Sequence, residues 1–156
     1  MRMGRGVEWA LHCCVNLAWA GSPVPTVRLA GLYGLPAAYL NKQLQALVRA
    51  GVLVSVPGPR GGFALERDPS QVTLLDVVVA LEGPEDAFRC TSILAAGPDG
   101  DPARDYADSC AISLSMRGAE LAWRRELAAR SLADVATDAL RYSPDAADRV
   151  RNALTS

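Results

Sequence analysis

The chain has 156 residues, half of them hydrophobic, and a formal net charge of −1. This length suffices for one compact core with an extension, and the hydrophobic content excludes an intrinsically disordered chain. Residues 1–70 carry seven Lys or Arg against three Asp or Glu, whereas residues 71–156 carry nine against fourteen. A basic front half joined to an acidic back half is typical of a nucleic-acid-binding module followed by a sensor or dimerisation module.

The first helix is predicted over residues 7–20. Basic residues precede this apolar stretch, as in a signal peptide, but Glu8, His12 and Asn16 interrupt it at every fourth position. This spacing indicates an amphipathic helix rather than a secretory signal. No apolar run approaches the ~18 residues of a membrane span. We therefore expect a cytoplasmic protein that does not bind a membrane.

A short second helix is predicted from Pro25 to Ala30, and a third helix begins at Pro36 and ends at Gly51. Proline suits a first helical turn, where its missing N–H is not needed, and glycine suits a helix end. Apolar residues recur along the third helix at helical spacing; they are Leu40, Leu44, Leu47 and Val48. The polar residues of this helix therefore lie largely on its other side.

Two short strands follow, over residues 52–56 and 63–67, with a turn-rich tip over 57–62 that contains three glycines. A polar-faced helix followed by a glycine-rich hairpin is typical of a winged helix-turn-helix. Such a helix enters the major groove of DNA, and the wing touches the neighbouring backbone or minor groove. The sequence therefore predicts a winged helix-turn-helix DNA-binding domain over residues 1–70.

Eight residues are predicted to contact DNA. Asn and Gln side chains pair with adenine, and Lys42 can reach a guanine edge or a phosphate. Arg60, at the wing tip, is placed to enter a minor groove, and Arg28 is a phosphate candidate. The full set is Arg28, Pro36, Ala38, Tyr39, Asn41, Lys42, Gln43 and Arg60. The alternative for each is a solvated polar surface, and Tyr39 could instead anchor the core.

The back half begins with a helix over about residues 74–81, which Thr73 is predicted to cap. A long loop follows over 84–109, and loops of this length are usually functional or disordered. A long helix is then predicted over 111–129, with a near-heptad apolar stripe; its members are Ile112, Met116, Ala119, Trp123 and Leu127. The stripe favours a two-fold homodimer. Packing against the chain's own first helix is the alternative.

A shorter helix is expected over residues 131–140, and residues 141–156 are expected to be a frayed tail. The back half is thus divided into a linker helix, cysteine loop and dimerisation helices over 71–140, followed by that tail. The expected fold class is mainly α with a small β wing: a winged helix-turn-helix DNA-binding domain plus a long dimerisation helix. The dimer would place two recognition helices on the half-sites of a palindromic operator in double-stranded DNA.

Four cysteines in a cytoplasmic protein indicate thiol, metal or redox use more than structural disulfides. Cys90 and Cys110 bracket the long loop, and thiolates are the usual ligands of iron–sulfur clusters. Zinc is disfavoured because the sequence has no Cys-x-x-Cys pair and one histidine. Cys13 and Cys14 are adjacent on the first helix, where successive side chains point about 100° apart. We expect these two to be small buried hydrophobic residues.

A sequence pattern runs from the third helix through the wing to the following helix: Tyr39-Leu40, Leu44, Leu47, Ala50-Gly51, Ser55, Gly58, Gly61-Gly62-Phe63, Leu74-Leu75-Asp76-Val77 and Gly83. This pattern resembles the Rrf2 family of bacterial winged-helix repressors, which includes the IscR, NsrR and CymR types. The resemblance extends over roughly residues 5–135. The sequences around Glu8, around Leu75, and at Cys90 and Cys110 are most similar to the RsrR type of redox regulator.

The resemblance to the RsrR type implies a 2Fe–2S cluster held between two subunits. Cys90 and Cys110 would come from one chain, and a glutamate and a histidine from the other. Glu8 matches that glutamate, but Tyr33 stands at the histidine position, and a phenol is a poor substitute for imidazole. The family also usually has three cysteines in this loop, where this chain has two. His12 is four residues after Glu8 on the same helix face. It could be a ligand, a hydrogen-bond partner of Glu8 or a structural histidine.

Three interpretations of the cysteine loop follow. Glu8 with Tyr33, His12 or solvent could complete a weakened cluster. Cys90 and Cys110 could instead form a reversible disulfide. The site could also be a relic that holds nothing.

The predicted function is a sequence-specific DNA-binding repressor that senses redox or nitrosative signals. The sequence has no nucleophile with a paired histidine, no phosphate-binding loop and no motif of paired carboxylates, so an enzyme is not expected. A winged helix can also serve as a protein–protein adaptor. The basic front half and the polar helix face disfavour that alternative.

Overall fold

The computed structural model describes residues 3–155. The ends of the predicted DNA-binding domain and tail, residues 1, 2 and 156, lie outside the described residues. The described chain forms two compact units. One, which we call the winged-helix unit, comprises residues 3–83 and 127–155; the other, the loop unit, comprises residues 84–126.

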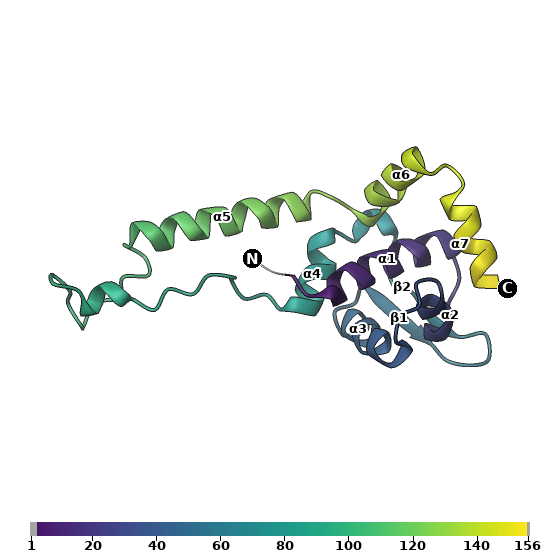
Figure 1. Cartoon of the computed structure of the whole chain (residues 1–156), viewed down its shortest axis with the longest axis horizontal. Coiled ribbons are helices and arrows are strands. Elements are labelled where there is room, and N and C mark those ends of the chain that lie inside the picture. The colour runs from purple at the N-terminus through teal and green to yellow at the C-terminus, as the bar shows by residue number, and fades with distance from the viewer. Residues whose placement is uncertain (1–2, 156) are drawn as a thin grey trace. The chain divides into compact units, whose positions relative to one another are not determined.

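Most of the described secondary structure is helical, with one two-stranded antiparallel sheet (Figure 1). The winged-helix unit contains α1 (Arg5–Ala20), α2 (Thr26–Gly31), α3 (Ala37–Arg49), β1 (Leu53–Val56), β2 (Gly62–Leu65), the 3₁₀ helix η1 (Pro69–Gln71), α4 (Leu74–Glu82), α6 (Leu132–Tyr142) and α7 (Ala146–Thr155). The loop unit contains the 3₁₀ helix η2 (Ile93–Ala96) and most of α5 (Ala111–Ala128). The predicted fold class, mainly α with a small β wing, is confirmed. None of the helices within residues 3–155 is long and apolar enough to cross a membrane.

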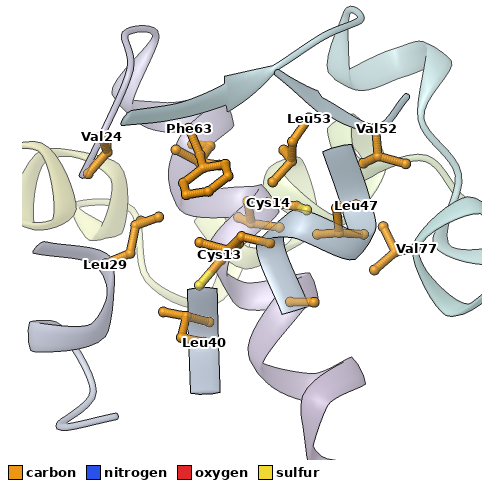
Figure 2. Close-up of a cluster of buried hydrophobic side chains, with 14 of the residues drawn as sticks. Cys13, Cys14, Val24, Leu29, Leu40, Leu47, Val52, Leu53, Phe63 and Val77 are labelled. Carbon is orange, nitrogen blue, oxygen red and sulfur yellow. The ribbon is translucent and has the colours of Figure 1, made fainter. Parts of the chain in front are cut away.

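The core of the winged-helix unit lies between α1, α3 and the hairpin. Cys13 and Cys14 are fully buried there, among leucines of α3 and β1 (Figure 2). Leu40, Leu44 and Leu47 of α3 are also fully buried, because they recur on one side of the helix. Burying a leucine side chain contributes about 1.5–3 kcal/mol, so α3 is held firmly by this side and presents its other side outward.

The wing is bonded to the segment that precedes α2. The N–H of Val24 donates to the carbonyl of Phe63, and the N–H of Phe63 donates to the carbonyl of Val24, both at 2.9 Å. Gly62 makes this approach possible: its φ is +146°, and a Cβ there would lie 2.2 Å from the Val24 carbonyl carbon. Within the hairpin, Leu53 pairs with Leu65 and Val56 with Gly62. The hairpin is therefore fixed, close to its turn, against the segment that precedes α2.

Two capped helices begin side by side in the winged-helix unit. Thr73 caps α4 as predicted, because its hydroxyl accepts from the N–H of Asp76 at 3.1 Å. Ser131 caps α6 in the same way through Asp134, also at 3.1 Å. A backbone bridge joins Thr73 to Ser131. This bridge joins the residue before α4 to the segment between α5 and α6.

The prediction of a frayed tail over residues 141–156 is wrong for the part that the structure describes. Helix α7 covers Ala146–Thr155, and Ala147 and Leu154 are 8% and 6% exposed. Apolar residues recur at helical spacing here, although they are few in a polar segment, and α7 packs against α1. The predicted boundary after residue 70 also differs from the structure, because residues 127–155 belong with residues 3–83.

Replacing Leu154 by alanine should lower the free energy of unfolding of the winged-helix unit by about 2–5 kcal/mol, as for other buried leucines. The matched control is Tyr142→Ala, because Tyr142 is 91% exposed and its loss should change stability by about 0.5 kcal/mol or less. Urea denaturation followed by circular dichroism measures both. Equal stability of the two variants would show that α7 does not contribute to the core.

The thiols of Cys13 and Cys14 should not react in the native protein. Burial raises the pKa of Cys13 to about 12; burial, and then the neighbouring Cys13, raises the pKa of Cys14. A raised pKa keeps a thiol neutral at pH 8, and the thiolate is the reactive form. With Ellman's reagent at pH 8, two of the four thiols of the reduced protein should react in buffer and all four in guanidinium chloride. Reaction of four thiols in buffer would contradict the buried placement.

Candidate DNA-binding surface and cysteine loop

The first two turns of α3 present a polar surface. Pro36, Ala38, Tyr39, Asn41 and Lys42 are exposed there. They lie opposite the buried leucines, as the helical spacing predicts. One side of α3 is therefore fixed in the apolar core, and its other side is exposed to solvent.

Two of the candidate base-reading residues are held by neighbours. The hydroxyl of Thr26, the first residue of α2, donates to the amide oxygen of Asn41 at 3.3 Å. Gln43 is half-buried, and its amide lies against Gly6 of α1, where an added Cβ would be 2.9 Å away. Gln43 thus packs toward α1, whereas Asn41 keeps its amide nitrogen for another partner.

Tyr39 is 46% exposed, and its ring packs edge-on against Trp9 of α1 at 5.3 Å between centroids. The ring of Tyr39 therefore packs against α1, as a core anchor does, and keeps a solvent-facing edge, as a DNA contact requires. Trp9 was not a candidate from the sequence, because the contact joins two helices that are distant along the chain.

The two arginine candidates differ in their partners. Arg60 is exposed at the tip of the hairpin, in a turn closed by the Gly61 N–H donating to the Gly58 carbonyl at 2.9 Å. The guanidinium of Arg28 donates to the carbonyl of Leu154, near the end of α7. The end of α7 therefore lies beside α2, which the sequence did not indicate.

Glu8, His12 and Tyr33 are all exposed on the winged-helix unit. The His12 and Tyr33 rings lie 5.7 Å apart between centroids. The hydroxyl of Tyr33 accepts from the amide of Asn16 at 2.8 Å, and Asn16 is 1% exposed. Among the described residues, no hydrogen bond joins His12 to Glu8. Tyr33 therefore has a structural task, because it satisfies a buried amide.

The two loop cysteines are half-buried free thiols. The Sγ of Cys90 accepts from the N–H of Ser92 at 3.4 Å. Ser92 has a left-handed backbone with φ of +52°, and its hydroxyl donates to Asp105 at 2.9 Å. Cys110 immediately precedes α5, and its carbonyl accepts from the N–H of Leu114 at 3.0 Å. The hydrogen bond between Ser92 and Asp105 thus joins the beginning of the loop between the cysteines to its later part.

Arg117 of α5 holds the end of this loop that leads into the helix. Its guanidinium donates to the carbonyl of Ala107 at 2.7 Å and to the carboxylate of Asp108 at 2.6 Å. The hydrogen bond to Asp108 raises the pKa of Arg117, and the charges of Asp108, Asp86 and Cys90 raise it further. Arg117 carries no signal in the sequence, because its partners lie far from it along the chain.

The next polar pair of α5 holds the start of the loop. Arg124 donates to the carboxylate of Glu120 at 2.7 Å and to the carbonyl of Pro84 at 2.9 Å. Burial alone raises the pKa of Glu120, but hydrogen bonds from Trp123 and Arg124 outweigh it and hold that pKa below its usual range. Helix α5 therefore turns polar residues toward its own loop.

The apolar residues of α5 are left on the outside. Those with large exposed side chains are Ile112 at 68%, Leu114 at 51%, Met116 at 42% and Leu121 at 54%. Of the predicted dimer stripe, Ile112, Met116 and Ala119 are exposed, whereas Trp123 and Leu127 are half-buried.

The candidate ligands of an iron–sulfur cluster are divided between the two units. Such a cluster takes four protein ligands, and the loop unit supplies two thiols. Glu8, His12 and Tyr33 belong to the winged-helix unit. Within residues 3–155, no group of three or more His, Cys, Asp or Glu side chains is arranged to hold a metal ion.

The chain is similar to known proteins in sequence and in structure. The chain is 32% identical over 120 residues to Protein aau3 of Rhizobium meliloti, covering 76% of this chain and 74% of that protein. It is 34% identical over 92 residues to the transcriptional regulator IscR of Photorhabdus laumondii, covering 58% and 56%.

Solved structures show the same fold. The CymR global cysteine regulator of B. subtilis aligns with a TM-score of 0.66 and 24% identity, over 88% of this chain and 97% of that one. IscR of T. potens aligns with a TM-score of 0.69 and 21% identity, over 92% and 91%.

The profile of the Rrf2 family, described as an iron-dependent transcriptional regulator, matches residues 3–138. Its members regulate transcription, which confirms the prediction that the chain is not an enzyme. The match extends over the helix-turn-helix, the wing, the cysteine loop and α5. The chain therefore belongs to the Rrf2 family of transcriptional regulators.

Proposed function

We propose that this regulator is a repressor that binds a palindromic operator in double-stranded DNA as a homodimer, and that Cys90 and Cys110 carry its sensor. The observation that supports it best is the polar surface at the start of α3. That surface is exposed while the other side of the helix is buried, and the wing beside it is bonded to the segment before α2. The proposed activity places the protein in the cytoplasm.

In the proposed complex, α3 enters the major groove. Lys42 supplies a cation to a guanine edge or a phosphate, and Asn41 offers its amide nitrogen to a base. Thr26 holds the amide of Asn41, which lowers the entropy lost on binding. Arg60 enters the neighbouring minor groove from the wing tip. Gln43 has a supporting role because it packs toward α1.

Alanine in place of Lys42 or Arg60 should weaken operator binding by about 1–3 kcal/mol each. Because the operator is unknown, the duplex should be selected from a random library with the wild-type protein. Fluorescence anisotropy at fixed salt measures the affinity. Arg141→Ala is the matched control, since it removes one positive charge from α6, and it should bind as tightly as the wild type.

The salt dependence of the same titration separates a DNA-binding regulator from a protein–protein adaptor. Affinity for duplex should fall linearly with salt on a double-logarithmic scale, because phosphate contacts release counterions. A chain that binds no duplex, or whose affinity does not change with salt, would be an adaptor.

Homodimerisation is proposed through α5. Ile112, Met116 and Ala119 of the predicted stripe are exposed and recur at helical spacing on one side of α5, and large exposed apolar patches mark interaction sites. A two-fold dimer presents this side twice, so that each helix packs on its copy. The winged-helix units would then contact two half-sites.

For the sensor, the first form proposed is a 2Fe–2S cluster shared between copies. Cys90 and Cys110 of one chain would supply two thiolates, and Glu8 of the second copy would supply a carboxylate, with Tyr33 or His12 as the remaining donor. When bound, the cluster would supply a group whose charge changes with redox state. Glu8 and His12 are exposed and free of ion pairs within the described chain, as a ligand offered to a second copy must be.

A cluster-free thiol switch is the second form. The thiols of Cys90 and Cys110 would lose two protons and two electrons to an oxidant such as a peroxide, and one S–S bond would form. Cys90 and Cys110 are both half-buried free thiols of the loop unit. This form needs no residue from the second copy.

Iron per chain after anaerobic reconstitution distinguishes the two forms. Cys90→Ser and Glu8→Ala should lose iron, and Tyr33→His should retain more, because imidazole is a better ligand than a phenol. Tyr142→His, which adds a histidine at a site of α6 that is 91% exposed, is the matched control and should match the wild type. Full iron in Cys90→Ser, or no iron in any variant, would leave the thiol switch or a relic site.

A further inference from the structure

A cleft of about 670 Å³ lies at one end of the winged-helix unit. Its lining comes from the tip of the β1–β2 hairpin, from the segment that runs from the end of α1 into α2, and from the C-terminal part of α7. Figure 1 shows these elements in the winged-helix unit. Each contributes an arginine: Arg60, Arg28 and Arg151. Helix α7 lies beyond the residues 3–138 that match the Rrf2 family, whereas Arg28 and Arg60 lie within them.

The lining of the cleft is positively charged. Among the described residues that line it, three are arginines and none is Asp or Glu, in a chain with a net charge of −1. Ser22 and Thr155 add hydroxyl groups to the same lining. Guanidinium and hydroxyl groups are the donors that phosphate oxygens accept from.

Two of the arginines are oriented by bonds that do not use all of their donors. Arg28 donates one N–H to the carbonyl of Leu154, a helix C-terminal carbonyl that favours a cation. Arg151 donates to the carbonyl of Trp19 at 3.3 Å and pairs with Asp148, which is outside the cleft lining. A guanidinium has five N–H donors, so each retains donors for a ligand.

We propose that this cleft binds a phosphate group and that Arg151 of α7 contributes to it together with Arg28 and Arg60. The group favoured is a backbone phosphate of bound duplex DNA, because Arg60 belongs to the wing that is proposed to follow the duplex. Helix α7 thereby extends the DNA-contacting surface beyond the winged helix. This inference rests on the proposed function for its choice of phosphate source, and a free phosphate is the other source.

The experiment compares duplex binding by wild type, Arg151→Gln and Arg149→Gln over a range of salt concentrations. Arg149 is the matched control, because it lies on α7, is ion-paired with Asp145 and does not line the cleft. Arg151→Gln should reduce the magnitude of the log–log salt slope by about 0.9, the value for one phosphate contact. Arg149→Gln should leave the slope unchanged. Equal slopes for the two variants would overturn the proposal.

Asp148→Asn separates a phosphate contact from a structural role of Arg151. If Arg151 only stabilised α7 through Asp148, this variant would bind duplex as weakly as Arg151→Gln. The proposal instead requires binding at least as tight as that of the wild type, because Arg151 loses a competing carboxylate. Arg151→Lys should recover part of the affinity, and circular dichroism should show the same helix content in all variants.

A titration with inorganic phosphate, followed through the arginine Nε–Hε signals in NMR spectra, identifies the source. If wild type binds duplex and Arg151→Gln does so with the same affinity and slope, the cleft proposal fails and the proposed function stands. If wild type binds no duplex but inorganic phosphate shifts the Arg151 signal, the cleft binds free phosphate and the proposed function fails. If neither ligand has an effect on Arg151, the cleft proposal is overturned.

Discussion

The burial of one side of α1 is the constraint on which the winged-helix unit depends. Helix α1 packs against α3, α4, β2, α6 and α7, and its residues Ala10, Cys13 and Cys14 have no exposed surface. Protein cores are close-packed, so a shift of one packed element is felt by its neighbours. The recognition helix and the C-terminal helices therefore share one core, although they lie at opposite ends of the sequence.

The shared core would give a physical route between the proposed sensor ligands and the proposed DNA-binding surface. Glu8, His12 and Tyr33 are exposed on or beside α1, while Gln43 and Tyr39 of α3 pack on Gly6 and Trp9 of the same helix. A ligand that moved α1 would move the partners of α3 directly. A coupling of about 1–3 kcal/mol between two such sites is enough to change occupancy usefully.

Periodicity and turn chemistry predicted most of the elements. The leucines of α3, the glycines of the wing and the cap at Thr73 each carry a local signal, and local signals do not depend on the rest of the fold. The orientation of Asn41 and Gln43 could not be predicted, because it depends on Thr26 and Gly6. Arg117 and Arg151 were missed for the same reason: their partners are set by tertiary structure. The tail was misjudged because a few apolar residues in a polar segment suffice when a core already exists.

The place of Leu154 in the core has a consequence for biosynthesis. The first helix of the chain is covered partly by the last, since α1 packs against both α6 and α7. On the ribosome, α1 and the helix-turn-helix emerge long before residue 154 is added, and domains fold from the N-terminal end as they are made. The core of the winged-helix unit is therefore complete only after residues 84–126 and the helix that contains Leu154 have been synthesised. Contacts so distant along the sequence also slow folding, which leaves the nascent chain dependent on protection of its exposed core residues.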